Sequence, residues 1–192
     1  EIRGAGNILG KEQHGHMQKI GYDMYLKLLD EVTRSLKGGL DAEAKEIKIE
    51  MPLDAYISDS YIESQEERIV YYDKISHISS SFEKEEVLKE LAILSGDVPK
   101  ETKNLCDIAL LKNLALNFNV KLIRINSKEC LVYFYKSEEI IDKRLSKMSE
   151  YYSFSLKFEE LPILKLNSAE SVENKMKILI DLFSKALSEK KD

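Results

Sequence analysis

The fold is decided by residues 99–117, PKETKNLCDIALLKNLALN, where apolar side chains recur on most sides of a helical projection. Pro99 suits the first turn of a helix, because the N–H group that proline lacks would have no helical partner there. A helix that is apolar on most sides has to be covered on most sides. We therefore expect it to lie at the centre of the core.

Two strand pairs are expected after this helix. Residues 120–125 and 129–135 are rich in β-branched and aromatic side chains and are separated by a short polar turn, which predicts a hairpin. Residues 154–158 and 163–166 predict a second pair. The order of elements predicts an α+β fold, in which helices pack with short antiparallel strand pairs after a glycine-rich loop and an amphipathic helix.

Two helices are expected before the central one. Ser60 and Glu63 have the spacing of a capping box, which predicts that a helix begins there. Residues 83–94 predict a second helix that stops at Gly96. The first of these helices is expected to turn four apolar side chains inward: Ile69, Tyr72, Ile75 and Ile78.

The remaining elements follow from hydrophobic periodicity. Residues 46–51 alternate between apolar and polar side chains and predict a strand, and residues 138–149 predict a helix. The final helix is expected to have one apolar face, formed by Val172, Met176, Leu179, Phe183 and Leu187.

The first 40 residues differ from the rest of the chain in glycine content and in hydrophobic pattern. Five of the eight glycines lie within the first 21 residues, so residues 3–15 predict a shaped loop. Residues 17–37 predict an amphipathic helix, and the small and charged residues 41–46 predict a linker. We expect two domains, 1–40 and 41–192. Because the chain starts at Glu1 without a methionine, we also expect it to be a piece of a longer protein.

Composition excludes several classes of protein. The chain has 192 residues and a net charge of -5, and an acidic whole argues against a free-standing nucleic-acid binder, which needs a basic surface. Its longest unbroken apolar run, residues 131–135, is far shorter than the about 20 residues that span a bilayer. Two distant cysteines, Cys106 and Cys130, fit a reducing, cytoplasmic setting and an inert place in the core.

The residues alone predict no active site. The glycines at 4, 6 and 10 come close to a phosphate-binding loop, but the spacing is one residue too long and no Walker lysine follows, which favours a structural turn. His14 and His16 lack a third metal ligand nearby, so we expect no metal site. Acidic pairs such as Glu85-Glu86 favour solvated helix faces over catalytic carboxylates.

Residues 1–15, EIRGAGNILGKEQHG, resemble a long and specific motif, I-R-G-x-G-x-x-L-G-x-x-Q-x-G. It is the translocation motif shared by RecG fork-reversal helicases and bacterial transcription-repair coupling factors (Mfd). The positions carried over from this resemblance are Arg3, Gly4, Gly6, Gly10, Gln13 and Gly15. The resemblance implies that they couple changes of ATP state to grip on DNA.

Later residues are similar to the coupling factors and separate them from RecG. GYDMYL at 21–26 resembles their G-F-D-L-Y-L, and residues 55–62 resemble A-Y-I-P-x-x-Y-I, with Ser58 in place of proline. Residues 68–75 resemble R-L-x-x-Y-x-R-I. The resemblance implies that residues 1–40 end a motor lobe and that residues 41–192 form a C-terminal regulatory domain. The tail of a RecG-like helicase is the alternative.

The resemblance also implies a function for the parent protein. Coupling factors are ATP-dependent double-stranded DNA translocases, or helicase-type hydrolases, that remove stalled RNA polymerase and recruit UvrA for nucleotide excision repair. ATP and magnesium belong to motifs upstream of this sequence, so we expect no cofactor and no enzymatic activity in the fragment itself. An inert piece of a motor, an interaction module and a small independent enzyme are the classes left open.

In the family, the C-terminal domain is an autoinhibitory clamp that docks on the protein's own N-terminal UvrB-like module and hides the UvrA-binding surface. The family pattern E-L-x-D-R-F-G corresponds to ELAILSG at 90–96. Glu90 is kept, whereas Ile93 and Leu94 replace a polar pair. We therefore expect these three residues at an interdomain contact that is more apolar than usual, unless Ile93 and Leu94 fill the domain's own core.

Overall fold

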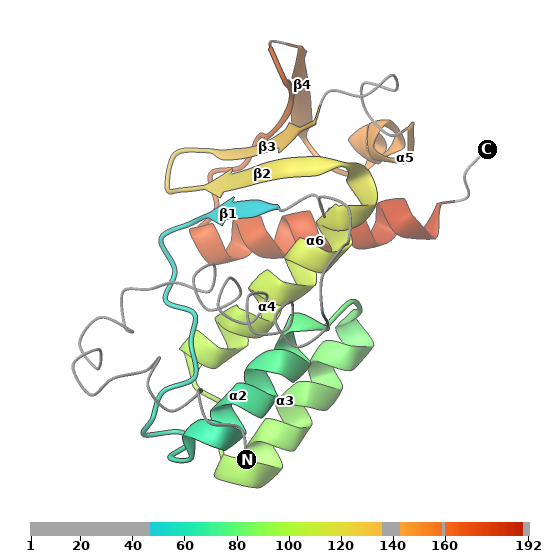
Figure 1. The fold of residues 1–192 in the computed structure, drawn as a ribbon. Helices are drawn as coiled ribbons and strands as arrows, with labels where there is room; N and C mark the ends of the chain where they lie inside the picture. The colour runs from blue at the N-terminus through green and yellow to red at the C-terminus, as the bar shows by residue number, and fades with distance from the viewer. Residues whose placement is uncertain (1–46, 136–142, 159, 190–192) are drawn as a thin grey trace, which may run out of the picture. The chain divides into compact units, whose positions relative to one another are not determined.

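The computed structural model describes residues 47–135, 143–158 and 160–189 (Figure 1). All of them belong to one compact unit of the chain, Leu40–Asp192. The glycine-rich loop, the helix at 17–37 and the linker at 41–46 lie outside the described residues, as do Arg3, Gln13 and the motif glycines. The domain boundary at 40/41 therefore stays a prediction.

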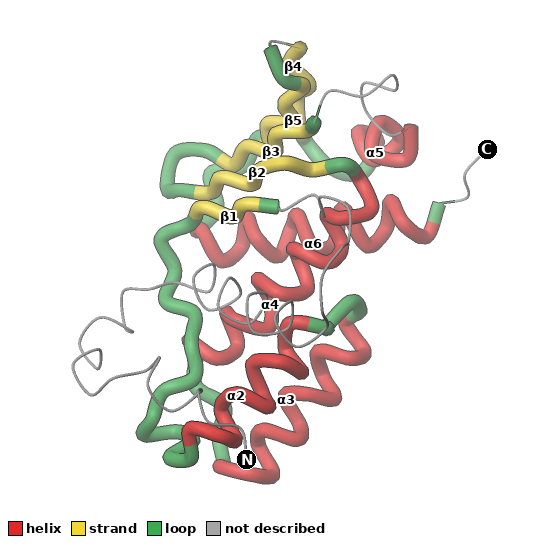
Figure 2. The backbone as a smooth tube through the Cα atoms, in the orientation of Figure 1, coloured by secondary structure: helices red, strands yellow, loops and turns green. Residues whose placement is uncertain are grey.

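The described residues form an α+β fold, as predicted, with helices on one side of a small sheet (Figure 2). Each predicted element within the described residues is present, although the helix expected at 138–149 is described only from Lys143. The helices are α2 (Gln65–Ser76), α3 (Ser81–Ser95), α4 (Lys100–Ala115), α5 (Lys143–Lys147) and α6 (Val172–Ser188), with 3-10 turns η2 (Leu116–Phe118) and η3 (Met148–Glu150). The strands are β1 (Lys48–Glu50), β2 (Val120–Ile125), β3 (Cys130–Phe134), β4 (Phe154–Phe158) and β5 (Pro162–Leu166).

The five strands make one mixed sheet in the order β1-β2-β3-β5-β4. The two predicted pairs, β2 with β3 and β4 with β5, are confirmed as antiparallel. Two features were not predicted: β3 pairs with β5, with Val132 opposite Leu164, and β1 runs parallel to β2, with Ile49 opposite Ile123. Parallel neighbours need a crossover connection, and α2, α3 and α4 supply it between β1 and β2.

Helix α4 is central, as its sequence predicts. Eleven of its 16 residues are buried, among them Leu105, Leu110 and Leu111, which have no exposed surface. Its buried polar side chains fasten neighbouring loops: Thr102 donates a hydrogen bond to the carbonyl of Tyr56 (3.0 Å), and Asn104 donates one to the carbonyl of Asp54 (3.0 Å). A hydrophobic helix with a few satisfied polar groups can thus be enclosed without leaving a buried donor unpaired.

Helix α6 packs beside α4 and holds the turn between β2 and β3. Its Met176, Leu179 and Phe183 are buried, as predicted, and the Phe183 ring stacks on Phe118 with centroids 5.2 Å apart. Lys175, which no pattern predicted to be inside, is fully buried, and its Nζ donates to the carbonyls of Asn126 (3.0 Å) and Ser127 (2.9 Å). These bonds compensate part of the cost of burying the ammonium group.

Both cysteines lie in this core. Cys106 on α4 and Cys130 on β3 have no exposed surface, as predicted for inert core residues. Burial raises the pKa of each thiol to about 12, because a thiolate would be poorly solvated there. Neither side chain is therefore available as a nucleophile at neutral pH.

The start of α2 differs from its prediction. Its N-cap is Ser64, whose hydroxyl accepts a hydrogen bond from the Glu67 N–H (3.2 Å). Ser60, the predicted cap, lies in the preceding loop and shares a hydrogen bond with the Ser58 hydroxyl (3.0 Å). The sequence holds two Ser-x-x-Glu patterns four residues apart, and only the second one caps the helix, so the predicted cap at Ser60 is wrong.

The orientation of α2 is also only partly as predicted. Tyr72 and Ile75 face the core, and Ile78 is buried just after the helix, where the chain turns. Ile69 is 42% exposed, so its predicted inward position is wrong. Tyr72 marks the side that is covered, because its hydroxyl accepts a hydrogen bond from the Ile57 N–H (2.9 Å).

The two candidate caps of α2 give a matched test. We expect Ser64→Ala to lower the free energy of unfolding by about 1 kcal/mol, because the Glu67 N–H loses its acceptor. Ser60→Ala is the control and is expected to change stability by less than about half that amount, as an exposed serine outside a cap does. Urea denaturation of both variants checks this, and an equal effect of the two substitutions would contradict the assignment of the cap.

Candidate interaction surface

The helices α2 and α3 lie side by side and are joined by a four-residue turn (Figure 1). Ser80 caps α3 by accepting from the Glu83 N–H (3.2 Å), and the Glu83 carboxylate accepts in return from the N–H (2.7 Å) and hydroxyl (2.8 Å) of Ser79. At the other end, Gly96 stops the helix with a φ of 82°, which side chains disfavour. Both ends of α3 are therefore firmly defined.

Helix α3 is poorly covered for a helix that carries so many apolar residues. Only Leu91 of its 15 residues is fully buried. Ile93 is 87% exposed and Leu94 is 43% exposed, and Glu90 lies one turn before them on the same helix. The structure thus places the three predicted contact residues together at the C-terminal end of α3, in contact with solvent. Ile93 and Leu94 do not fill the domain's own core.

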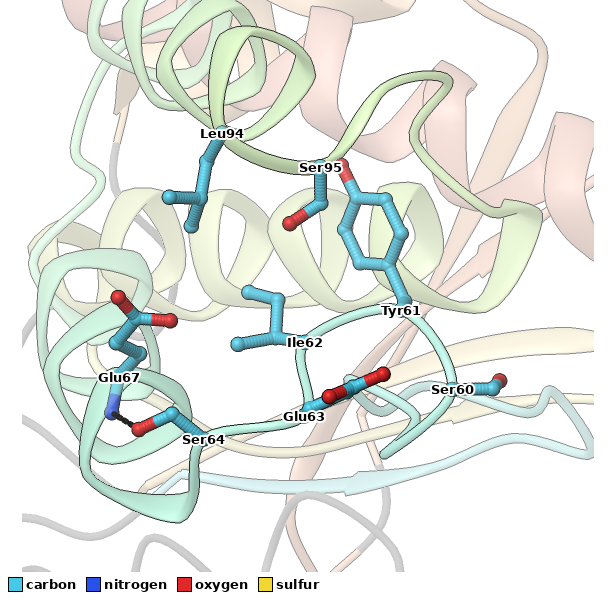
Figure 3. Close-up of a pocket in the computed structure, with 8 residues that line it drawn as sticks. All are labelled: Ser60, Tyr61, Ile62, Glu63, Ser64, Glu67, Leu94 and Ser95. Carbon is cyan, nitrogen blue, oxygen red and sulfur yellow. Dashed lines mark hydrogen bonds between the residues drawn. The ribbon is translucent and has the colours of Figure 1, made fainter.

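A shallow pocket of about 730 Å³ adjoins this end of α3 (Figure 3). Its walls are the loop before α2, the first turn of α2 and the last turn of α3. The lining residues are Ser60, Tyr61, Ile62, Glu63, Ser64, Glu67, Leu94 and Ser95. We call the end of α3, from Glu90 to Ser95, together with this pocket, the α3-end surface.

Tyr61 fastens the loop to the helix. Its hydroxyl lies 2.9 Å from the Leu91 carbonyl oxygen and 3.2 Å from that of Gly96, so it bridges the last turn of α3 and the C-cap residue. Partial burial raises the pKa of the Tyr61 hydroxyl, so it stays protonated and remains a donor. The loop itself is braced by Arg68, whose guanidinium donates to the carbonyls of Ile62 and Glu63.

Glu90 is already engaged within the domain. Its carboxylate lies 2.6 Å from Lys74 Nζ on α2, and this bond is the main cause of the raised pKa of Lys74. Both side chains are about half exposed, so the ion pair adds little stability. It does orient Glu90 toward α2, which a single sequence cannot reveal.

Charge is concentrated on the α2–α3 region. Residues 60–97 contain nine acidic and four basic side chains, a net charge of -5. The whole chain also has a net charge of -5, so the remaining residues are neutral in sum. A surface with an apolar centre and an acidic surround is complementary to a partner with a basic surround.

The polar side chains of the α3-end surface are either exposed or already hydrogen-bonded within the domain. Its carboxylates, such as Glu63 and Glu67, lie in solvent, and its one phenol is occupied by carbonyl oxygens. Within the described ranges, no group of three or more His, Cys, Asp or Glu side chains could hold a metal ion, and no helix is long and apolar enough to cross a membrane. The sequence analysis did not predict that the loop at 60–64 is part of a site. Part of this loop resembles a family motif, but that resemblance alone does not indicate a binding role.

Comparisons with known proteins agree on one family. The model of the TRCF domain matches residues 51–145. The transcription-repair-coupling factor of Staphylococcus epidermidis is 33% identical over 153 residues, which is 78% of this chain and 13% of that protein. The coupling factor of Bacillus subtilis is 36% identical over 124 residues, which is 64% of this chain and 10% of that protein.

A solved structure supports the fold. The crystal structure of the C-terminal domain of a transcription-repair coupling factor matches with a TM-score of 0.63 at 21% identity, over 74% of this chain and 92% of that one. The chain spans only 10–13% of the length of the curated relatives described above. The sequence likenesses show that the chain belongs to the transcription-repair coupling factor family.

Proposed function

We propose that this chain is the C-terminal regulatory part of a coupling factor and acts as an autoinhibitory interaction module. In this proposal the α3-end surface docks on the protein's own N-terminal UvrB-like module and masks the surface that binds UvrA. The parent protein is an ATP-dependent translocase on double-stranded DNA that removes stalled RNA polymerase. A RecG-like tail is not favoured, because the matched relatives are coupling factors.

The observation that carries the proposal is the exposure of Ile93 and Leu94 on a helix with a single fully buried residue. Isolated apolar side chains on a surface are ordinary, but adjacent ones beside a pocket mark a site of interaction. Their burial in a complex stabilises it by about 25 cal/mol per Å² of apolar surface, less the costs of association. The acidic surround of the α2–α3 region selects a basic partner surface.

The proposal assigns no chemistry to this chain. The hydrolysis of ATP, with magnesium, belongs to the upstream motor of the parent protein. Arg3 and Gln13 of the translocation motif, with Gly4, Gly6, Gly10 and Gly15, are proposed to transmit changes of nucleotide state to the grip on DNA. Arginine suits that role because its planar, permanently charged group can brace several carbonyl or phosphate oxygens at once.

The apolar contact is tested by placing a charge in it. We expect Ile93→Asp or Leu94→Asp to weaken binding of this chain to the purified N-terminal module tenfold or more, since burying either side chain contributes about 1.5–3 kcal/mol. Leu116→Asp is the matched control, because Leu116 is also apolar and 51% exposed but lies on η2, outside the α3-end surface. Isothermal calorimetry measures the three affinities, and equal losses in all three variants would rule out a specific contact.

The acidic contact needs a control for the internal ion pair. Glu90→Lys is expected to weaken docking by a few-fold and to reduce its dependence on salt, because one attraction to the basic partner is lost. The double variant Lys74→Glu/Glu90→Lys restores an ion pair within the domain. If docking recovers fully in the double variant, Glu90 acts only by holding Lys74 and does not touch the partner.

Masking is tested in the full-length protein. Deleting residues 41–192 is expected to raise the affinity for UvrA, because the surface that binds it is uncovered. Surface plasmon resonance with immobilised UvrA compares the deletion with the intact protein and with its Leu94→Asp variant, which should fall between them. An unchanged affinity in the deletion would mean that this domain hides nothing from UvrA.

A further inference from the structure

The side of the sheet away from α6 is a second, partly exposed surface of the domain. Ile123, Val132 and Leu164 are directly paired on β2, β3 and β5 and are fully buried toward the helices. Residues that alternate with them must therefore point to the other side. We call this side the open face, and its polar and aromatic side chains on the paired strands are Lys48, Glu50, Arg124, Tyr133, Ser155, Lys157 and Lys165. We include three flanking residues: Lys121, at the irregularity in β2, and Glu129 and Tyr135, which lie directly before and after β3.

The strand register brings these side chains into two rows across the sheet. One row runs Glu50, Arg124, Leu131, Lys165 and Ser155, and the other runs Lys48, Leu122, Tyr133, Ile163 and Lys157. Directly opposed residues on neighbouring strands share a face and lie close together. Side chains from distant parts of the chain therefore form one surface. Lys48 and Lys165, for example, are 117 positions apart in the sequence and come from different ends of the domain.

The open face is basic, although the chain is acidic. It carries five cationic side chains and two carboxylates. Of the carboxylates, Glu50 is held by Lys48 (2.7 Å) and by Arg124 (2.8 Å), so it presents little charge to a ligand. The excess of positive charge faces solvent, since Lys121 and Lys157 are exposed.

Two tyrosines lie among these cations. Tyr133 lies on β3 and Tyr135 directly follows the last residue of that strand, so the two are about 6.6 Å apart if the extended backbone continues. The guanidinium carbon of Arg124 lies 5.7 Å from the Tyr133 ring centroid, and Lys121 Nζ lies 5.8 Å from that of Tyr135. Aromatic rings next to arginine and lysine form platforms on which unstacked bases rest, while the cations take the phosphates.

We propose that the open face of the sheet binds single-stranded nucleic acid, with bases on Tyr133 and Tyr135 and phosphates on the surrounding lysines and Arg124. A duplex hides the faces of its bases within the stack, so it would engage the cations alone. This site lies on a different face from the α3-end surface. It does not depend on the docking proposed above.

Binding is measured by fluorescence anisotropy of labelled oligo(dT) and oligo(U) of about twelve nucleotides, within the range of site sizes known for such surfaces. A duplex of the same length is the comparison. We expect both single strands to bind at low salt and the duplex to bind more weakly. Equal or tighter binding of the duplex, or no binding of either single strand, would overturn the proposal.

The cations are tested through the salt dependence. Lys157→Gln/Lys165→Gln is expected to reduce the slope of log K against log salt by about 1.4, which is about 0.7 for each lost phosphate contact on a single strand. Lys89→Gln/Lys103→Gln removes the same charge from α3 and α4, away from the sheet, and should leave the slope unchanged. The same change of slope in both variants would show that only net charge matters and would contradict a site on the open face.

The role of the two tyrosine rings in base stacking is tested by replacing them with an apolar side chain that has no aromatic ring. Tyr133→Leu/Tyr135→Leu is expected to weaken binding about tenfold or more, whereas Tyr133→Phe/Tyr135→Phe keeps the rings and should retain it. Thermal melting followed by circular dichroism confirms that each variant folds. If the leucine variant does not fold, the lysine pair decides the question. Unchanged binding by a folded leucine variant would overturn the role of base stacking.

Discussion

The rest of the structure depends on the enclosure of α4. This helix is apolar on nearly all sides, so it cannot lie on a surface and has to be surrounded. Helices α2 and α3 lie against it on one side and α6 on another, and the 3-10 turn that follows leads directly into β2 (Figure 1). The partly buried ion pair between Lys84 and Asp107 (3.0 Å) ties α3 to α4, and Asn113 donates to the carbonyls of Ser76 and Ile78 where α2 ends.

The same constraint explains why α3 is exposed. Helix α4 needs cover, and α3 supplies it chiefly through Leu91, which has no exposed surface. Once that contact is made, the outer side of α3 has nothing left to pack against among the described elements. A helix kept only for the stability of this domain would place polar side chains there, yet it ends in Ile93 and Leu94. The exposed apolar pair therefore adds nothing to the core of this domain, which is why the docking proposed above is centred on it.

Much of the fold could be predicted from the sequence, because helices and strands each have a characteristic local spacing of apolar residues. The bounds of β2, the central place of α4 and the burial of Met176, Leu179 and Phe183 on α6 followed from spacing alone. What failed depends on contacts between distant residues. Ser64 rather than Ser60 caps α2 because Tyr61 draws the preceding loop to the end of α3, and Lys175 can be buried only because two turn carbonyls from the β2–β3 hairpin meet its ammonium.

The candidate surfaces show the same limit more sharply. Periodicity could not decide whether Ile93 and Leu94 lie in the core or on the surface, because helix α3 is weakly amphipathic. Which side of α3 is covered depends on how it packs against α4. Net charge is a poor guide to binding surfaces for a similar reason. It is a sum over the whole chain, whereas a ligand contacts only one face of the fold. Here the α2–α3 region holds a charge equal to the total, and the strands bring distant lysines together on the open face. An acidic protein can therefore present a basic surface, provided that the fold keeps the two charges on separate elements.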